Sequence, residues 1–144
     1  MRSYLGGCHC GAVKVAFASA ADPASLETRS CGCGFCSRHG ARTVSDPEGV
    51  LAITFEPDAV RRYRFGLGIT DFIVCGRCGC YVAAIMEDGG ATFGIANTLM
   101  FKARDAFTKP TAPRDYGAED EAGRRARRRA MWTPVTHAPD FDAA

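Results

Sequence analysis

The chain has 144 residues, of which 47% are hydrophobic and 24% are charged, and its formal net charge is +2. This length suits one compact domain that can bury a core, and it argues against two domains. The charge is too small to require a polyanionic partner, and no apolar stretch reaches membrane-spanning length.

The N-terminal segment MRSYLGG contains one arginine and no apolar run behind it. Signal peptides need such a run, so we expect a cytoplasmic protein without membrane partners. The chain also has eight cysteines, most of them two or three positions apart. In a reducing compartment, this clustering favours metal binding over disulfides.

Short segments of alternating apolar and polar residues predict a mainly β fold. Alternation marks half-buried strands, and turn-forming stretches such as SDPEG, GLG and EDGG separate the segments. A short helix is expected to begin at DPASLE, with Asp22 as its N-cap and Pro23 in its first turn. The predicted strands cover residues 12–17, 51–55, 61–65, 69–74, 81–86 and 91–96.

The alternation stops near Asp105, which divides the expected organisation in two. Residues 1–105 are predicted to form a zinc-binding β domain, and residues 106–144 an irregular or partly helical C-terminal extension. Within this extension, EDEAGRRARRRA carries five arginines between positions 124 and 129. As a helix it would pair Asp120 with Arg124 and Glu121 with Arg125, and its other arginines would face solvent.

Two cysteine pairs predict a closed metal site. Cys8 and Cys10 form one pair, and Cys75 and Cys78 form the other. Four thiolates complete the tetrahedral shell of a structural zinc ion, and the glycine after each pair permits a tight turn. Such a site would join the first strand to the hairpin of residues 69–74 and 80–86.

The segment CGCGFC predicts a second, open site. Cys31, Cys33 and Cys36 can reach one metal ion from a single loop, and their number stops at three. Three protein ligands with a vacant position are typical of catalytic zinc. We therefore expect two zinc ions per chain, the second of them labile.

Other interpretations of these cysteines remain open. The trio could be a structural zinc site completed by His39, an iron–sulfur site, or a redox group that binds no metal. Cys80 follows the second pair closely enough to form an alternative trio with Cys75 and Cys78. We assign Cys80 to the core because it alternates with apolar residues of a predicted strand.

Three motifs in order, GGCHCGAVKVAF, CGCGFCSRHGA and YRFGLGITDFIVCGRCGCYV, resemble the glutathione-dependent formaldehyde-activating enzyme family. This family is also called S-(hydroxymethyl)glutathione synthase, and it includes centromere protein V. The resemblance covers roughly residues 5 to 100. It implies a β-tent fold, a structural zinc on Cys8, Cys10, Cys75 and Cys78, and a catalytic zinc on Cys31, Cys33 and Cys36.

The resemblance further implies a carbon–sulfur lyase that adds glutathione, or another small thiol, to formaldehyde or a related small aldehyde. We expect Arg38 to hold a glutathione carboxylate and His39 to transfer a proton. The alternative function is a nonenzymatic zinc-binding module that contacts nucleic acid or protein through its Arg-rich tail. Nearby acidic residues offset much of that tail's charge, which weakens the case for nucleic acid.

Overall fold

The structure is a computed structural model that describes residues 1–141. These residues form a mainly β molecule with two α-helices, α1 (Gly34–His39) and α2 (Glu121–Met131), and three short 3₁₀ helices. None of the helices in this range is both long and apolar enough to cross a membrane. The strands are β1 (Arg2–Gly7), β2 (Val13–Ser19), β3 (Arg29–Cys31), β4 (Thr43–Val44), β5 (Val50–Phe55), β6 (Val60–Tyr63), β7 (Asp71–Cys75), β8 (Tyr81–Asp88), β9 (Ala91–Asn97), β10 (Ala112–Arg114) and β11 (Thr133–His137).

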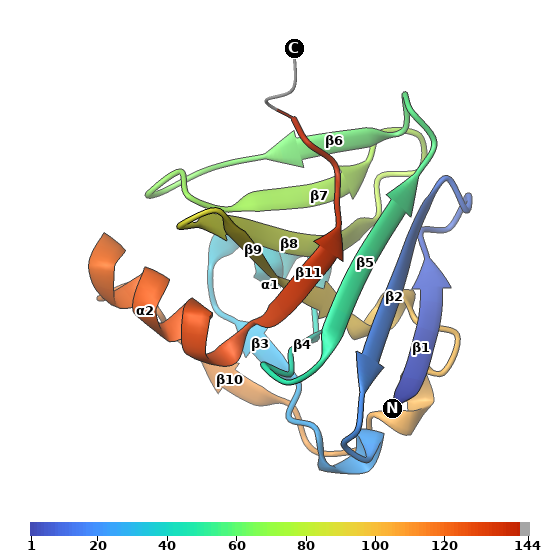
Figure 1. Ribbon diagram of the computed structural model, residues 1–144, viewed down its shortest axis with the longest axis horizontal. Helices are drawn as coiled ribbons and strands as arrows, with labels where there is room; N and C mark the ends of the chain where they lie inside the picture. The colour runs from blue at the N-terminus through green and yellow to red at the C-terminus, as the bar shows by residue number, and fades with distance from the viewer. Residues whose placement is uncertain (142–144) are drawn as a thin grey trace.

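All the strands in the described range belong to one branched sheet. Its main path runs β1-β2-β5-β11-β9-β4-β3-β10, and β8, β7 and β6 branch from β9. The branch arises because β9 pairs with β8 and also with two further strands, β11 at Phe93 and Gly94 and β4 at Ala96 and Asn97. Figure 1 shows the β1, β2, β5 and β11 group crossing the group formed by β6 to β9.

The main core lies between these two groups of strands. Phe17, Leu51 and Ile53 enter it from β2 and β5, while Ile73 and Val82 enter it from β7 and β8, and all five are fully buried. In β2 and β5 these residues alternate with less buried neighbours, which is the pattern that predicted the two strands. Strand β8 is instead buried along most of its length. All six predicted strands are present, with ends that differ by a few residues. The turn at Asp22 is also present, as a 3₁₀ helix at Pro23–Ser25.

The C-terminal segment differs from the expected extension because it is built into the sheet. Strand β11 pairs with β9 in an antiparallel manner and with β5 in a parallel manner, so it joins the two groups of strands. Thr133 is fully buried there. The strand is short and contains Pro134, so its sequence lacks the apolar alternation that identified the others.

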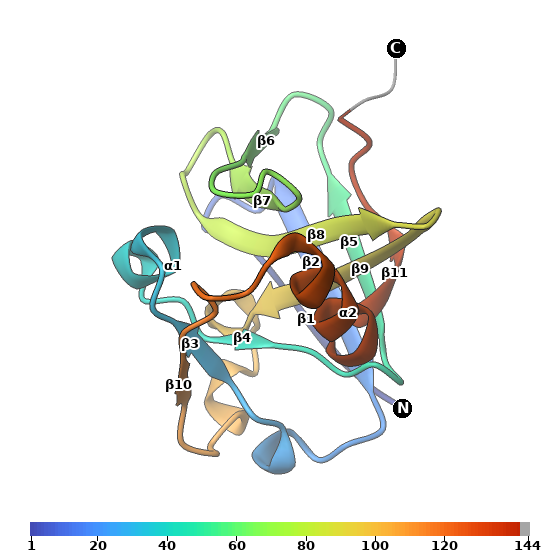
Figure 2. The ribbon, with the colours of Figure 1, turned by 90° about the vertical axis from the view of Figure 1, so that its left-hand side faces the viewer.

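Helix α2 is held against the sheet by arginines. Asp120 caps its N-terminus by accepting a hydrogen bond from the Gly123 N–H. Arg125 and Arg129 both form ion pairs with Asp88 at the end of β8. Figure 2 shows the helix in front of β8 and β9. Since α2 lacks an apolar stripe, these ionic contacts explain how a highly charged helix is docked.

Candidate metal centres

The structure brings the two distant cysteine pairs into one cluster. The Sγ atoms of Cys8, Cys10, Cys75 and Cys78 all lie within 4.8 Å of one another. The Cys8–Cys10 and Cys10–Cys75 sulfur distances are 3.7 and 3.6 Å. Four sulfurs placed about 2.3 Å from a central ion would be separated by roughly 3.8 Å, so the cluster fits a tetrahedral metal site.

Matching backbone turns aim these sulfurs at a common point. Gly11 follows Cys10 with φ of 82°, and Gly79 follows Cys78 with φ of 81°. Side chains with a Cβ atom avoid this left-handed region, so glycine is required for both turns. The Val13 N–H donates to Cys8 Sγ, and the Arg77 N–H donates to Cys75 Sγ. The expected clip is therefore present as a four-sulfur cluster that could hold a metal ion.

The three cysteines of CGCGFC form a second cluster. Cys31 ends β3, Cys33 caps the N-terminus of α1, and Cys36 lies in the first turn of that helix. Their Sγ atoms also lie within 4.8 Å of one another, and no histidine or carboxylate of the described residues joins them. The loop expected here is instead a six-residue helix. It is too short for hydrophobic periodicity to reveal it.

Hydrogen bonds to sulfur favour thiolates in this cluster. The Cys33 N–H donates to Cys31 Sγ, and the Cys36 N–H donates to Cys33 Sγ. A hydrogen bond from the Cys36 thiol, assisted by the backbone at Cys33, holds the pKa of Cys31 at about 5. The same thiol contact, together with burial, raises the pKa of Cys36. One readily ionised thiol among close neighbours is a donor set suited to a metal cation.

Cys80 belongs to neither cluster. It is half-buried and packs against the main core, as predicted, but it lies just before β8 and not within that strand. Burial raises its pKa. Cys80 therefore provides a natural control for substitutions at the clustered cysteines.

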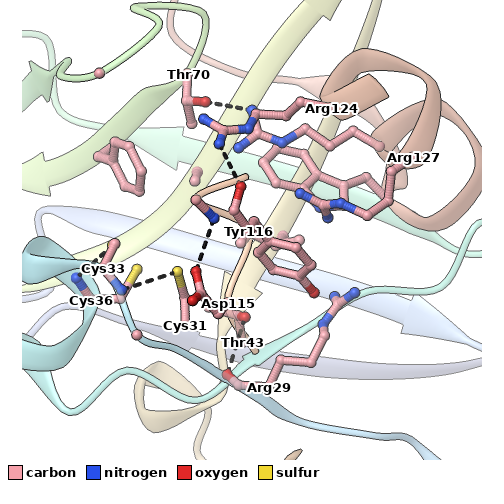
Figure 3. A pocket seen from close by; sticks show the side chains of 18 of the residues that line it. Arg29, Cys31, Cys33, Cys36, Thr43, Thr70, Asp115, Tyr116, Arg124 and Arg127 are labelled. Carbon is pink, nitrogen blue, oxygen red and sulfur yellow. Dashed lines mark hydrogen bonds between the residues drawn. The ribbon is translucent and has the colours of Figure 1, made fainter. Parts of the chain in front are cut away.

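The three-cysteine cluster lies in the wall of a cavity of about 420 Å³. Figure 3 shows the three cysteines on one side of this cavity and Arg124 and Arg127 on another. Asp115 lies beside Cys31 in the same view. The lining also includes aromatic side chains from several segments, namely Phe65, Phe72, Tyr116 and Trp132. The cavity thus combines a metal-binding cluster, apolar surface and positive charge.

No family model matches the chain. The chain is similar in structure to a crystallised Rhodobacter sphaeroides protein, a Northeast Structural Genomics target, with 24% sequence identity and a TM-score of 0.54. The similarity covers 76% of this chain and 97% of that chain. At this level of identity it supports the fold alone.

The arginines of α2 have different surroundings from those expected. Arg124 and Arg127 pair with Glu119, and both line the cavity. The guanidinium of Arg127 also lies 3.6 Å from the ring centre of Tyr116. The predicted pair of Glu121 with Arg125 is present, with 3.6 Å between the charged atoms. Sequence spacing could find this local pair but not the arginines that face the cavity.

Arg38 and His39 do not line the cavity that contains the cysteines. Both are exposed, and they line a second, more open cavity of about 650 Å³. Arg38 donates to the Gly34 carbonyl of its own helix, and the His39 ring lies 4.6 Å from that of Phe35. They follow the trio in sequence, but the turn of α1 carries their side chains to another surface.

Proposed function

We propose that this protein is a zinc-dependent carbon–sulfur lyase of the glutathione-dependent formaldehyde-activating type, with the β-tent fold of that family. Its reaction would add glutathione, or a related small thiol, to a small aldehyde. The mainly β sheet, the order of the three cysteine motifs and the two cysteine clusters support this assignment. It also accounts for both clusters with one kind of ion.

The observation that carries the proposal is the position of the three-cysteine cluster in the wall of a cavity. A structural site needs a full set of protein ligands, whereas a catalytic site leaves a position for water or substrate. Cys31, Cys33 and Cys36 supply three ligands, and a cavity of about 420 Å³ adjoins them. This volume falls within the range of small-molecule sites.

The residues present suit a zinc ion in both places because thiolates are preferred zinc ligands. When bound at the trio, zinc would supply Lewis acidity and favour the thiolate form of a bound thiol. In the proposed addition, the substrate sulfur forms a bond to the carbonyl carbon as the carbon–oxygen π bond breaks. The proton of the thiol ends on the resulting alkoxide, and no redox step is needed.

Asp115 is the lining residue best suited to carry that proton. It lines the same cavity as Cys31 and directly follows Arg114, which pairs with Cys31 between β10 and β3, and its Oδ1 accepts a hydrogen bond from the Gly117 N–H. That bond orients the carboxylate while leaving its second oxygen for a substrate proton. We therefore assign proton transfer to Asp115 in place of His39, which lines a different cavity.

The nucleic-acid alternative receives less support from these contacts. Four of the five clustered arginines form ion pairs with Glu119 or Asp88, and the fifth, Arg128, is buried. Phosphate binding depends on accessible positive charge, so a stripe engaged in this way is a poor phosphate surface.

Native mass spectrometry tests the proposal, combined with an assay of thiol–aldehyde adduct formation. We expect two zinc ions per chain, one of which dissociates readily or is converted to a zinc–glutathione adduct. Catalysed adduct formation should depend on the labile ion. A single tightly held ion, unaffected by glutathione after zinc is resupplied, would contradict the proposed open site.

A further inference from the structure

Arg128 is a buried cation without an acidic partner. Its side chain lines the same cavity as the three cysteines, and only 7% of the residue is exposed. One guanidinium nitrogen donates to Thr70 Oγ1, the guanidinium lies 4.2 Å from the Trp132 ring centre, and its Nε has no acceptor among the described residues. Buried charges in proteins are normally paired. An unpaired one is costly unless a ligand supplies the opposite charge.

A second cavity arginine has a similar environment. Arg29 in β3 is half-buried and donates to the Ser45 hydroxyl, while Arg124 and Arg127 share Glu119. Burial lowers the pKa of Arg29 and brings that of Arg128 to about 10, so Arg128 remains protonated at neutral pH. The cavity wall therefore has more positive charge than the chain neutralises.

We propose that this wall is a carboxylate-binding subsite, with Arg128 as its central residue and Arg29 in support. The subsite would select substrates that carry a carboxylate in addition to the reacting thiol or aldehyde. This inference rests on the proposed function, because it names the substrate class of the same cavity. The responsible helix, α2, lies outside the segment that the cysteine motifs cover.

The balance of charge favours a carboxylate over a phosphate dianion. The lining contains four arginines, Arg29, Arg124, Arg127 and Arg128, against two carboxylates, that of Asp115 in the lining and that of Glu119, which pairs with Arg124 and Arg127. A divalent ion on three thiolates would add one further negative charge. About one positive charge then remains, which a monoanionic carboxylate neutralises. The planar guanidinium also matches carboxylate geometry.

Isothermal titration calorimetry of the zinc-loaded protein tests the subsite without any turnover. The probes are S-methylglutathione, its dimethyl ester, succinate and inorganic phosphate, none of which has a free thiol or an aldehyde. We expect S-methylglutathione and succinate to bind. Loss of the charged contact at the subsite should weaken binding about 10- to 100-fold, both for the ester, whose two carboxylates are masked, and for the Arg128→Met variant.

Two matched variants separate ligand binding from a structural role. Arg128→Met keeps an apolar stem of similar length, and removal of an unpaired buried charge should leave the Tm of the free protein equal or higher. Arg129→Gln is the control, because Arg129 is exposed, pairs with Asp88 and does not line the cavity. It should bind both carboxylate probes as the unchanged protein does.

Several results would overturn the subsite. These are equal binding of the ester, wild-type affinity in Arg128→Met, tighter binding of phosphate than of carboxylates, or no binding of either carboxylate probe. Carboxylate binding that depends on Arg128 in a protein without thiol–aldehyde activity would support the subsite and reject the proposed function. Activity that is equal with charged and esterified thiols would support the function and reject the subsite.

Discussion

The two cysteine clusters have similar sulfur geometry but different relationships to the fold. Cys10 and Cys75 are 65 positions apart, so the four-cysteine cluster connects distant parts of the chain. The trio comes from six consecutive residues and adjoins a cavity. Closing a long loop restricts the unfolded chain much more than closing a short one. Stability should therefore depend on the first cluster, and chemistry on the second.

The largest effect is expected when the four-cysteine cluster loses a ligand. Cys78→Ser removes one sulfur, and structural zinc binding is worth about 10 kcal/mol or more, comparable to the whole stability of a small domain. We expect the variant to be largely unfolded, as measured by circular dichroism and zinc content. Cys80→Ser, two positions away and outside the cluster, should fold normally. A folded Cys78→Ser protein with full zinc content would show that this cluster is not the main clip.

The same substitution in the trio should separate activity from folding. Cys33→Ser leaves two of three sulfurs, so we expect thiol–aldehyde activity to be abolished and one zinc ion to be lost. Thermal unfolding should change much less than in Cys78→Ser, because the trio connects only neighbouring residues. If both replacements unfolded the protein equally, both clusters would be structural and the comparison above would fail.

Local patterns explain why both clusters could be predicted from the sequence. The Cys8–Cys10 and Cys75–Cys78 spacings, each followed by a glycine, define turns that depend on few other residues. The strands with fully buried Phe17, Leu51 and Ile53 also follow from local alternation. The sequence therefore predicted most of the sheet and the donor atoms of the candidate sites.

The remaining parts depend on tertiary docking, which spacing does not encode. Strand β11 contains Pro134 and fills a place between β5 and β9 that exists only once those strands are assembled. Helix α2 presents Arg128 to the cavity where an apolar residue would be expected. Asp115 joins Cys31 in the cavity lining because β10, which ends one residue before it, pairs with β3, more than eighty positions earlier in the chain. None of these three tertiary placements can be recognised from a short stretch of sequence.

A moderate effect is expected at Asp115, which adjoins only the open cluster. Asp115→Asn removes the proposed proton carrier but keeps an acceptor for the Gly117 N–H. We expect kcat to fall about 100-fold. Zinc content and Tm should remain unchanged. His39→Gln is the comparison variant, and a larger loss of kcat in it would return proton transfer to His39.

The smallest effect on stability is expected at Asp88, which anchors α2 through its ion pairs with Arg125 and Arg129. Hydrogen bonds from Arg129, opposed by partial burial and aided by Arg125, lower the pKa of Asp88. A lowered pKa in the folded state means that the ionised carboxylate stabilises the folded protein at pH values above the ordinary carboxyl pKa, near 4. This contribution disappears as the pH falls through the folded-state pKa of Asp88. Asp88→Asn should therefore lower Tm slightly at pH 7, and this difference from the unchanged protein should disappear as the pH falls through the folded-state pKa of Asp88.

Thermal unfolding of Asp88→Asn across this pH range checks the sign, with the exposed Asp58→Asn as control. Both zinc ions should remain bound and the carboxylate probes should bind as expected for Arg129→Gln, because Asp88 belongs to neither cluster and does not line the cavity. A loss of zinc from the four-cysteine cluster in this variant would mean that the two regions are energetically coupled. The three-cysteine cluster and the cavity arginines would then not be independent of the four-cysteine cluster that stabilises the fold.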